Sequence, residues 1–139
     1  MKKKFPIWGW VILSVVLLTV AGFFILHKPQ PVATSLPAEI TVDQAETMRN
    51  QGAYILDVRE LSEWVQFHIP GATLIPLGEL PNRLSEVPED RTVIVVCRTG
   101  YRSAQGRDIL LHAGFTKVTS MAGGMTQWQA NGLPTVTGQ

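Results

Sequence analysis

One stretch of sequence decides the fold of this chain: Thr92-Val93-Ile94-Val95-Val96-Cys97-Arg98-Thr99-Gly100-Tyr101-Arg102-Ser103. Its first five residues are all β-branched and show no polar alternation. That pattern is typical of a strand that parallel neighbours bury on both faces. Apolar residues at helical spacing follow over 103–112. The stretch therefore predicts a buried parallel strand, a short loop and a helix.

The sequence on either side predicts further strands and helices in alternation. Short apolar runs indicate strands over 54–56, 73–75 and 116–120. Helices are expected over 42–50 (with Thr41 as N-cap), 60–67, 77–87 and 125–131. Alternation of this kind predicts an α/β domain with an open parallel sheet and helices on both faces.

The front of the chain is apolar. Residues 5–26, 22 in number, include no charged side chain. A helix of that length spans roughly 33 Å, and the hydrocarbon core of a bilayer is about 30 Å thick. We therefore expect a transmembrane helix over 5–26, between a basic tail at 1–4 and a proline-rich linker at 27–38.

Basic residues predict the orientation of this anchor. Lys2, Lys3 and Lys4 precede the apolar run and only Lys28 follows it. The positive-inside rule then keeps the N-terminus cytoplasmic and places the rest outside, on a single-pass protein of the cell membrane. A cleaved export signal is the alternative, with Ala33-Thr34-Ser35 as an imperfect cleavage match. Signal apolar regions run about 7–15 residues, so the longer run favours an uncleaved anchor.

Composition excludes several other classes of protein. Hydrophobic residues make up 45% of the chain and its net charge is +1, so intrinsic disorder is not the main state. The single cysteine excludes an internal disulfide and a zinc site built on paired cysteines. After residue 38 there are 11 acidic and 8 basic residues, a net charge of −3. We therefore expect no nucleic-acid partner.

The chemistry is expected at the loop that follows the buried strand. Ligands of open α/β sheets bind outside the carboxyl ends of the strands. A short loop that closes into a helix turns backbone N–H groups inward, and Gly100 provides the backbone freedom for it. Those donors, Arg98 and Arg102 would stabilise a Cys97 thiolate. The alternative is that Cys97 is only a small buried hydrophobic residue.

Several motifs resemble the rhodanese domain, a sulfurtransferase module. The resemblance covers 39–133 and rests on an Asp-Val-Arg turn, a His-Ile-Pro-Gly-Ala segment after Glu63-Trp64, the loop 97–102, and Gly123-Gly124-Met125 with Trp128. It implies a domain over 39–134 with a five-stranded parallel sheet, followed by a C-terminal tail at 135–139. Phe67 departs from the family, which often has glycine there.

The resemblance also implies a two-step sulfur transfer. The Cys97 thiolate would take a sulfur atom from a small anionic donor such as thiosulfate, and cyanide or a thiol would accept it. No cofactor and no metal are expected. Arg98 and Arg102 are candidates for holding the donor, and Asp57 and Arg59 for bracing the loop. The remaining loop candidates are Thr99, Gly100, Tyr101 and Ser103.

Two other functions stay open at this point. A phosphatase or arsenate reductase of related architecture also uses a cysteine and an arginine around an anion, but with five residues between them rather than the four found here. A partner-binding module without catalysis is the second alternative. We expect His68 to be a hydrogen-bonded structural residue, His112 to be solvated or to cap its helix, and Trp128 to lie in the core.

Overall fold

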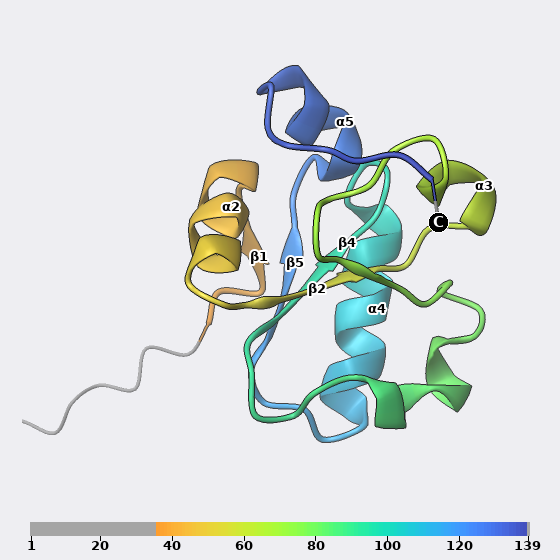
Figure 1. The fold of residues 1–139 in the computed structure, drawn as a ribbon. Coiled ribbons are helices and arrows are strands. Elements are labelled where there is room, and N and C mark those ends of the chain that lie inside the picture. Colours follow the sequence, from red (N-terminus) through yellow and green to blue (C-terminus); the bar gives the residue numbers. More distant parts are fainter. Residues whose placement is uncertain (1–35, 139) are drawn as a thin grey trace, which may run out of the picture. The chain divides into compact units, whose positions relative to one another are not determined.

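The run 93–96 forms the centre of a parallel sheet in the computed structural model, which describes residues 36–138 (Figure 1). The sheet has five strands in the order β1-β5-β4-β2-β3, all paired in parallel. The strands are β1 (Glu39–Ile40), β2 (Tyr54–Asp57), β3 (Thr73–Leu74), β4 (Val93–Val96) and β5 (Val118–Met121). The α/β class and the five-stranded parallel sheet are therefore confirmed.

Three helices and two 3₁₀ turns connect these strands, and one further helix, α5, follows β5. They are α2 (Val42–Asn50), α3 (Leu61–Trp64), η1 (Leu80–Asn82), η2 (Leu84–Glu86), α4 (Tyr101–His112) and α5 (Gly124–Ala130). Thr41 caps α2 as predicted, because its hydroxyl accepts the Gln44 N–H at 3.2 Å. The Gln44 side chain in turn accepts the Thr41 N–H at 2.9 Å, which completes a capping box.

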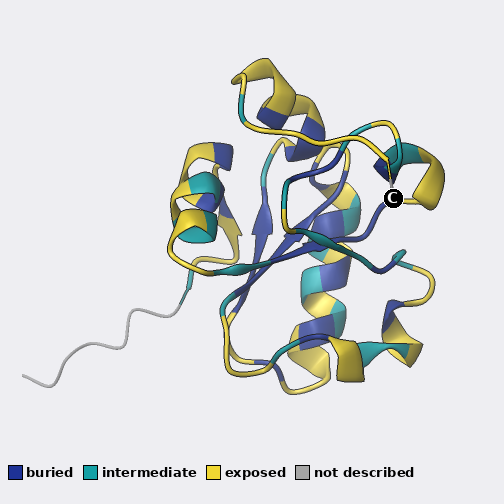
Figure 2. Ribbon diagram, viewed as in Figure 1, coloured by how far each residue is buried: buried dark blue, intermediate teal, exposed yellow. Residues whose placement is uncertain are grey.

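The sheet separates two apolar clusters. Val93, Val95 and Cys97 face the cluster that α4, η1 and the segment around Val87 cover. Ile94 and Val96 face the other cluster, which α2 and α5 cover. All four residues of β4 are buried, as are all four of β5 (Figure 2). Helices on both faces explain why β4 lacks polar alternation.

The predicted helix over 77–87 is wrong. That segment instead forms η1 and η2, with 3₁₀ bonds such as Arg83 N–H to Leu80 O at 3.1 Å. A helix starting at Leu77 would need the Pro81 N–H for its second intrahelical bond. Proline has no N–H, and its ring clashes with the preceding turn. Leu80 still reaches the core, with no exposed surface.

Other boundaries differ by a few residues. Helix α3 covers only Leu61–Trp64 of the predicted 60–67, and its N-cap is Glu60. Helix α4 begins at Tyr101, two residues earlier than expected, so Tyr101 and Arg102 belong to its first turn. The strand predicted over 116–120 lies at Val118–Met121.

The C-terminal tail is attached to the domain by backbone hydrogen bonds. Val136 and His68 exchange two of them, of 2.8 and 2.9 Å.

The expected basic N-terminal tail, the membrane helix and most of the linker lie outside the described residues. Within 36–138 no helix combines the length and apolarity that a bilayer crossing needs.

Candidate active site

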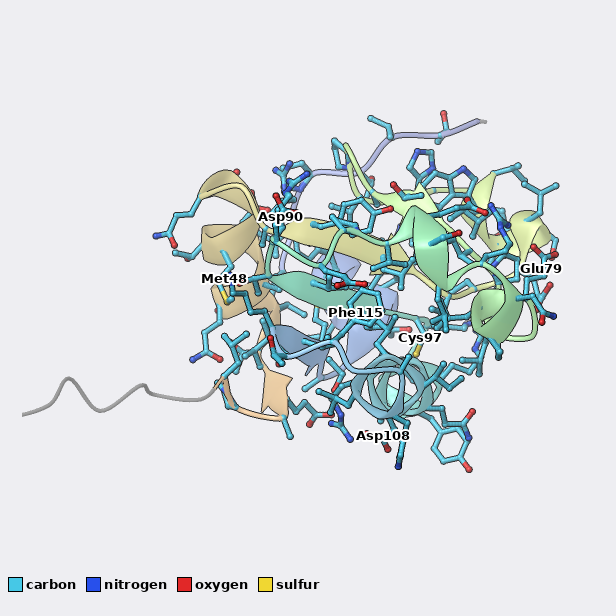
Figure 3. All side chains as sticks on the ribbon, turned by 90° about the horizontal axis from the view of Figure 1, so that it is seen from below. Met48, Glu79, Asp90, Cys97, Asp108 and Phe115 are labelled. Atoms are coloured by element: carbon cyan, nitrogen blue, oxygen red, sulfur yellow. The ribbon has the colours of Figure 1, made fainter. Side chains whose placement is uncertain are left out.

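Cys97 directly follows β4 and lies at the N-terminal end of α4. The residue is 1% exposed, and in Figure 3 it lies immediately over α4, which is seen end-on. Its Sγ accepts the backbone N–H of Gly100 at 3.1 Å, and its thiol donates to the Ser103 hydroxyl at 3.6 Å. Among the described residues, Gly100 supplies the one backbone N–H that is bonded to the sulfur. The sulfur therefore has fewer backbone donors than expected.

The turn between Cys97 and α4 depends on Gly100. This residue has φ of +111°, in the region that residues with a Cβ avoid, and it is the N-cap of α4. The buried Ser103 hydroxyl donates to the Gly100 carbonyl at 2.7 Å and closes the turn. The predicted loop residues Gly100 and Ser103 therefore hold the sulfur, whereas Thr99 and Tyr101 are exposed, Tyr101 at 75%.

Helix α5 supports the loop from its other side. The N–H groups of Met125 and Thr126 donate to the carbonyls of Cys97 and Arg98, at 2.8 and 3.0 Å. Gly124 makes this approach feasible, because a Cβ there would lie 2.5 Å from the carbonyl oxygens of Cys97 and Arg98. The Gly-Gly motif thus allows two backbones to touch.

Arg102 is paired with Glu63 in this structure, and its expected role in holding a donor stays a prediction. Its guanidinium donates to both carboxylate oxygens of Glu63, at 2.7 and 2.8 Å. The pair is partly buried and joins α3 to the first turn of α4. Hydrogen bonding to Arg102 lowers the pKa of Glu63, and the same bonds raise the pKa of Arg102.

Arg98, by contrast, has no such partner. It is exposed, and within residues 36–138 it is the one arginine whose guanidinium makes no hydrogen bond or ion pair. It lines a pocket of about 220 Å³ at the α3 and α5 side of the loop, together with Gln66, Thr126 and Gln129. An unpaired guanidinium on the residue that follows Cys97 is suited to binding an oxyanion.

Asp57 and Arg59 form a buried ion pair beside the loop. Three bonds of 2.7 to 2.9 Å join the guanidinium to the carboxylate, and neither residue is more than 1% exposed. Asp57 is in register with Val96, and the Val58 N–H bonds to the Val96 carbonyl at 2.9 Å. The pair thus lies at the end of the strand next to the one from which the loop starts, where it was expected to brace the loop, and it makes no hydrogen bond to the Cys97 sulfur.

The unusual Phe67 also belongs to this brace. Its carbonyl accepts a bond from Arg59 at 2.8 Å, and its ring lies 5.3 Å from the Arg59 guanidinium carbon. A cation over an aromatic face is attracted to the ring. Phe67 thus contacts Arg59 through both its carbonyl and its ring.

The two expected structural side chains next to the site are confirmed. His68 is buried, hydrogen-bonds the Trp64 carbonyl at 3.1 Å and stacks on the Trp64 ring at 3.6 Å. Trp128 is fully buried and donates to the Pro134 carbonyl at 2.9 Å. His112 is exposed and bonds to the Asp108 carbonyl of its own helix at 2.7 Å.

Sequence reasoning missed the role of two residues. Glu63 and Gly124 stand in motifs that it quoted, but their partners are distant in sequence, at Arg102 and at Cys97 and Arg98. The signal that could have found them is a charged residue and a glycine placed within otherwise apolar motifs. No group of three or more His, Cys, Asp or Glu residues suited to a metal ion occurs in 36–138.

Comparison with known proteins agrees with this site. The rhodanese-like domain family matches residues 41–131, and the chain belongs to that family. A protein named sulfurtransferase from Allochromatium vinosum is 39% identical over 82 residues, covering 59% of this chain and 77% of that protein. The chloroplastic thiosulfate sulfurtransferase 16 of Arabidopsis thaliana is 35% identical, covering 72% of this chain and 93% of that protein.

The solved structures agree on the fold. The crystal structure of a rhodanese-related protein from Thermoplasma volcanium superimposes with a TM-score of 0.67 at 27% identity. The match covers 72% of this chain and 98% of that one. Family membership and the position of Cys97 in its loop both point to chemistry at the Cys97 sulfur.

Proposed function

We propose that this protein is a sulfurtransferase that moves a sulfane sulfur from a donor such as thiosulfate to cyanide or a thiol through a Cys97 persulfide. The observation that carries the proposal is the Cys97 sulfur held by the Gly100 N–H at 3.1 Å, with the unpaired Arg98 as the next residue. The relatives named sulfurtransferase support the same reaction class.

The first step forms one S–S bond and breaks another. The Cys97 thiolate attacks the outer sulfur of thiosulfate, and the sulfur–sulfur bond of the donor breaks to release sulfite with its electron pair. The persulfide anion left on Cys97 lies where the Gly100 N–H can donate to it. Arg98 would hold the sulfonate oxygens of the incoming donor.

The second step returns the free thiolate. Cyanide attacks the outer sulfur of the persulfide and leaves as thiocyanate, or an acceptor thiolate leaves as a persulfide. The Cys97 sulfur departs with the electron pair of the broken bond, so no net oxidant or reductant is needed. A single activated thiol suffices for both steps.

The test is thiosulfate:cyanide sulfurtransferase activity of the full chain in detergent, beside Cys97→Ser. We expect thiocyanate from the parent protein and none above background from the variant. Mass spectrometry after thiosulfate treatment should show about 32 Da, one sulfur atom, added to the parent alone, as covalent catalysis requires. A folded parent protein that gains no sulfur from thiosulfate or from an organic persulfide contradicts the proposal.

One observation favours a second candidate, a partner-binding module without catalysis. Cys97 is 1% exposed, as a merely structural cysteine would be. The persulfide measurement separates the two, because such a module would bind no sulfur. A phosphatase would instead hydrolyse an aryl phosphate. The spacing of four residues between Cys97 and Arg102 disfavours this class of enzyme.

We also propose that residues 5–26 anchor the protein in the cell membrane, with the catalytic domain outside. The uncharged run and the lysines at its front support this. The test is alkaline extraction of membranes, followed by protease treatment of spheroplasts or intact cells. The protein should resist extraction, and the domain should be accessible to external protease. A protected domain contradicts the orientation, and release into the supernatant contradicts the anchor.

A further inference from the structure

The ion pair between Glu63 and Arg102 spans 39 positions of sequence and reaches the loop that holds the sulfur. Arg102 lies two residues after Gly100 and directly before Ser103. Those two neighbours are the ones that contact Cys97 Sγ, at 3.1 and 3.6 Å. Any restraint on Arg102 is therefore a restraint on the geometry around the sulfur.

We propose that Glu63 is a positioning residue of the sulfur site: it fixes Arg102, and through Arg102 the turn that presents Gly100 and Ser103 to Cys97. Its effect on turnover rests on the proposed function. Its effect on the position of the loop does not.

Glu63 is itself well placed to act as a fixed point. One of its carboxylate oxygens also accepts the Glu60 N–H at 3.2 Å, at the start of α3. The next residue, Trp64, is buried and stacks on His68. The carboxylate is thus bonded to the start of a short helix that the buried Trp64 packs into the domain. A preorganised partner restrains a side chain at a lower entropic cost.

Gly100 is the part of the loop that needs this restraint. A glycine loses more backbone freedom on ordering than any other residue, and its N–H points at the sulfur only in one conformation. Helix α5 fixes the start of the loop, through the carbonyls of Cys97 and Arg98. The ion pair fixes its end at Arg102, so the loop is tied at both sides of Gly100.

The ion pair also gives Arg98 and Arg102 different roles. Both carboxylate oxygens of Glu63 are bonded to Arg102, which neutralises its charge. Arg98 is then the cation that remains for a donor anion. Loss of Glu63 should therefore change turnover more than it changes the KM for thiosulfate.

The chain offers a matched control. Glu46 and Arg49 form a second partly buried, two-pronged pair on α2, with bonds of 2.8 and 3.1 Å. Arg49 further donates to the Pro70 carbonyl at 3.2 Å. Hydrogen bonding within the pair lowers the pKa of Glu46, as it does for Glu63. Glu46→Gln thus removes an ion pair of similar burial, within one helix and away from the loop.

The deciding experiment measures how fast iodoacetamide alkylates the full chain in detergent. Cys97 is the single cysteine of the chain, so the rate is followed as loss of the free thiol, which reports on Cys97 alone while the lysines also react. At about pH 10, above the ordinary range for thiols, the rate reflects access to the sulfur. We expect Glu63→Gln to raise it about fivefold or more, because loosening the loop exposes a buried atom. Glu63→Asp should lie between, and Glu46→Gln should match the parent protein.

Turnover provides the second readout. For Glu63→Gln we expect kcat to fall about tenfold, since a small misplacement of reacting groups is costly, with KM changed less than about twofold. Equal alkylation rates in Glu63→Gln, Glu46→Gln and the parent protein overturn the proposal, even if turnover falls. If alkylation separates the variants while no protein accepts sulfur, the positioning role stands and the proposed function fails.

Discussion

The chemical character of this site is set by how its charged side chains are paired. Arg102 belongs to the first turn of the helix after Cys97, and Arg59 follows the neighbouring strand; both are paired with carboxylates, of Glu63 and Asp57. Arg98 is not engaged by any described residue. An arginine that is already hydrogen-bonded must lose those bonds before it can bind a ligand, so the unpaired one is the better anion site.

At the residue scale, we predict that Arg98→Gln raises the KM for thiosulfate about tenfold, equal to roughly 1.4 kcal/mol, with a smaller change in kcat. Initial rates at varied thiosulfate check this. Arg91→Gln is the control for net charge, since Arg91 precedes β4 and bonds to the Gly52 carbonyl. Similar KM values for the two variants would show that Arg98 does not contact the donor.

A second prediction concerns the buried brace. Arg59→Met leaves the Asp57 carboxylate buried without its cation and should lower the free energy of unfolding by about 3–5 kcal/mol. Adding Asp57→Asn should recover part of the loss, because the uncompensated charge is gone. Urea unfolding in detergent measures both. A loss below about 1 kcal/mol, as for a surface pair, would mean that water reaches this carboxylate.

At the element scale, the start of α5 packs against the loop that follows Cys97. Gly124 has φ of +56°, and a Cβ there would lie 2.5 Å from backbone atoms of Cys97 and Arg98. Backbone atoms cannot swing aside as a side chain can. The close contact therefore couples the position of α5 to the position of the loop.

We predict that Gly124→Ala reduces both stability and sulfur transfer. Gly132→Ala is the matched control, because Gly132 has φ of +67° and open space around its Cβ position. The control should cost about 1–2 kcal/mol from backbone strain alone and keep its activity. Gly124→Ala should cost clearly more and lower kcat. Equal unfolding midpoints and equal turnover in the two variants would rule out the steric coupling.

At the scale of the whole molecule, acid should destabilise the domain. Bonds to arginine lower the pKa of Glu46 and of Glu63 in the folded state. A lowered folded pKa gives stability that is present above the unfolded value, about 4.3, and is lost as the pH falls through the folded value.

We therefore predict that the free energy of unfolding is nearly constant from about pH 7 to 5.5 and falls below about pH 4.5. The double variant Glu46→Gln/Glu63→Gln should be less stable near neutral pH and lose less on acidification. Thermal unfolding across this range is the measurement. If the parent protein and the double variant fall in parallel, other carboxylates govern the acid response.

The class of the fold and the place of Cys97 at the end of a buried strand could be predicted from the sequence alone. The uninterrupted β-branched run 92–96 could only be a strand buried on both faces, and the cysteine that follows it had to lie at the carboxyl end of the sheet. These conclusions depend on residues that are neighbours in the chain. The same holds for the Thr41 cap, which the structure confirms.

Only the tertiary structure decided which side chains serve the sulfur and which serve the scaffold. Arg98 and Arg102 look alike in sequence, yet one is unpaired and the other is bound to Glu63, 39 positions away. The segment 77–87 has helical spacing, yet Pro81 divides it into 3₁₀ turns whose apolar residues still pack in the core. Ion pairs and close backbone contacts depend on which distant elements pack together, and no local pattern of residues records that.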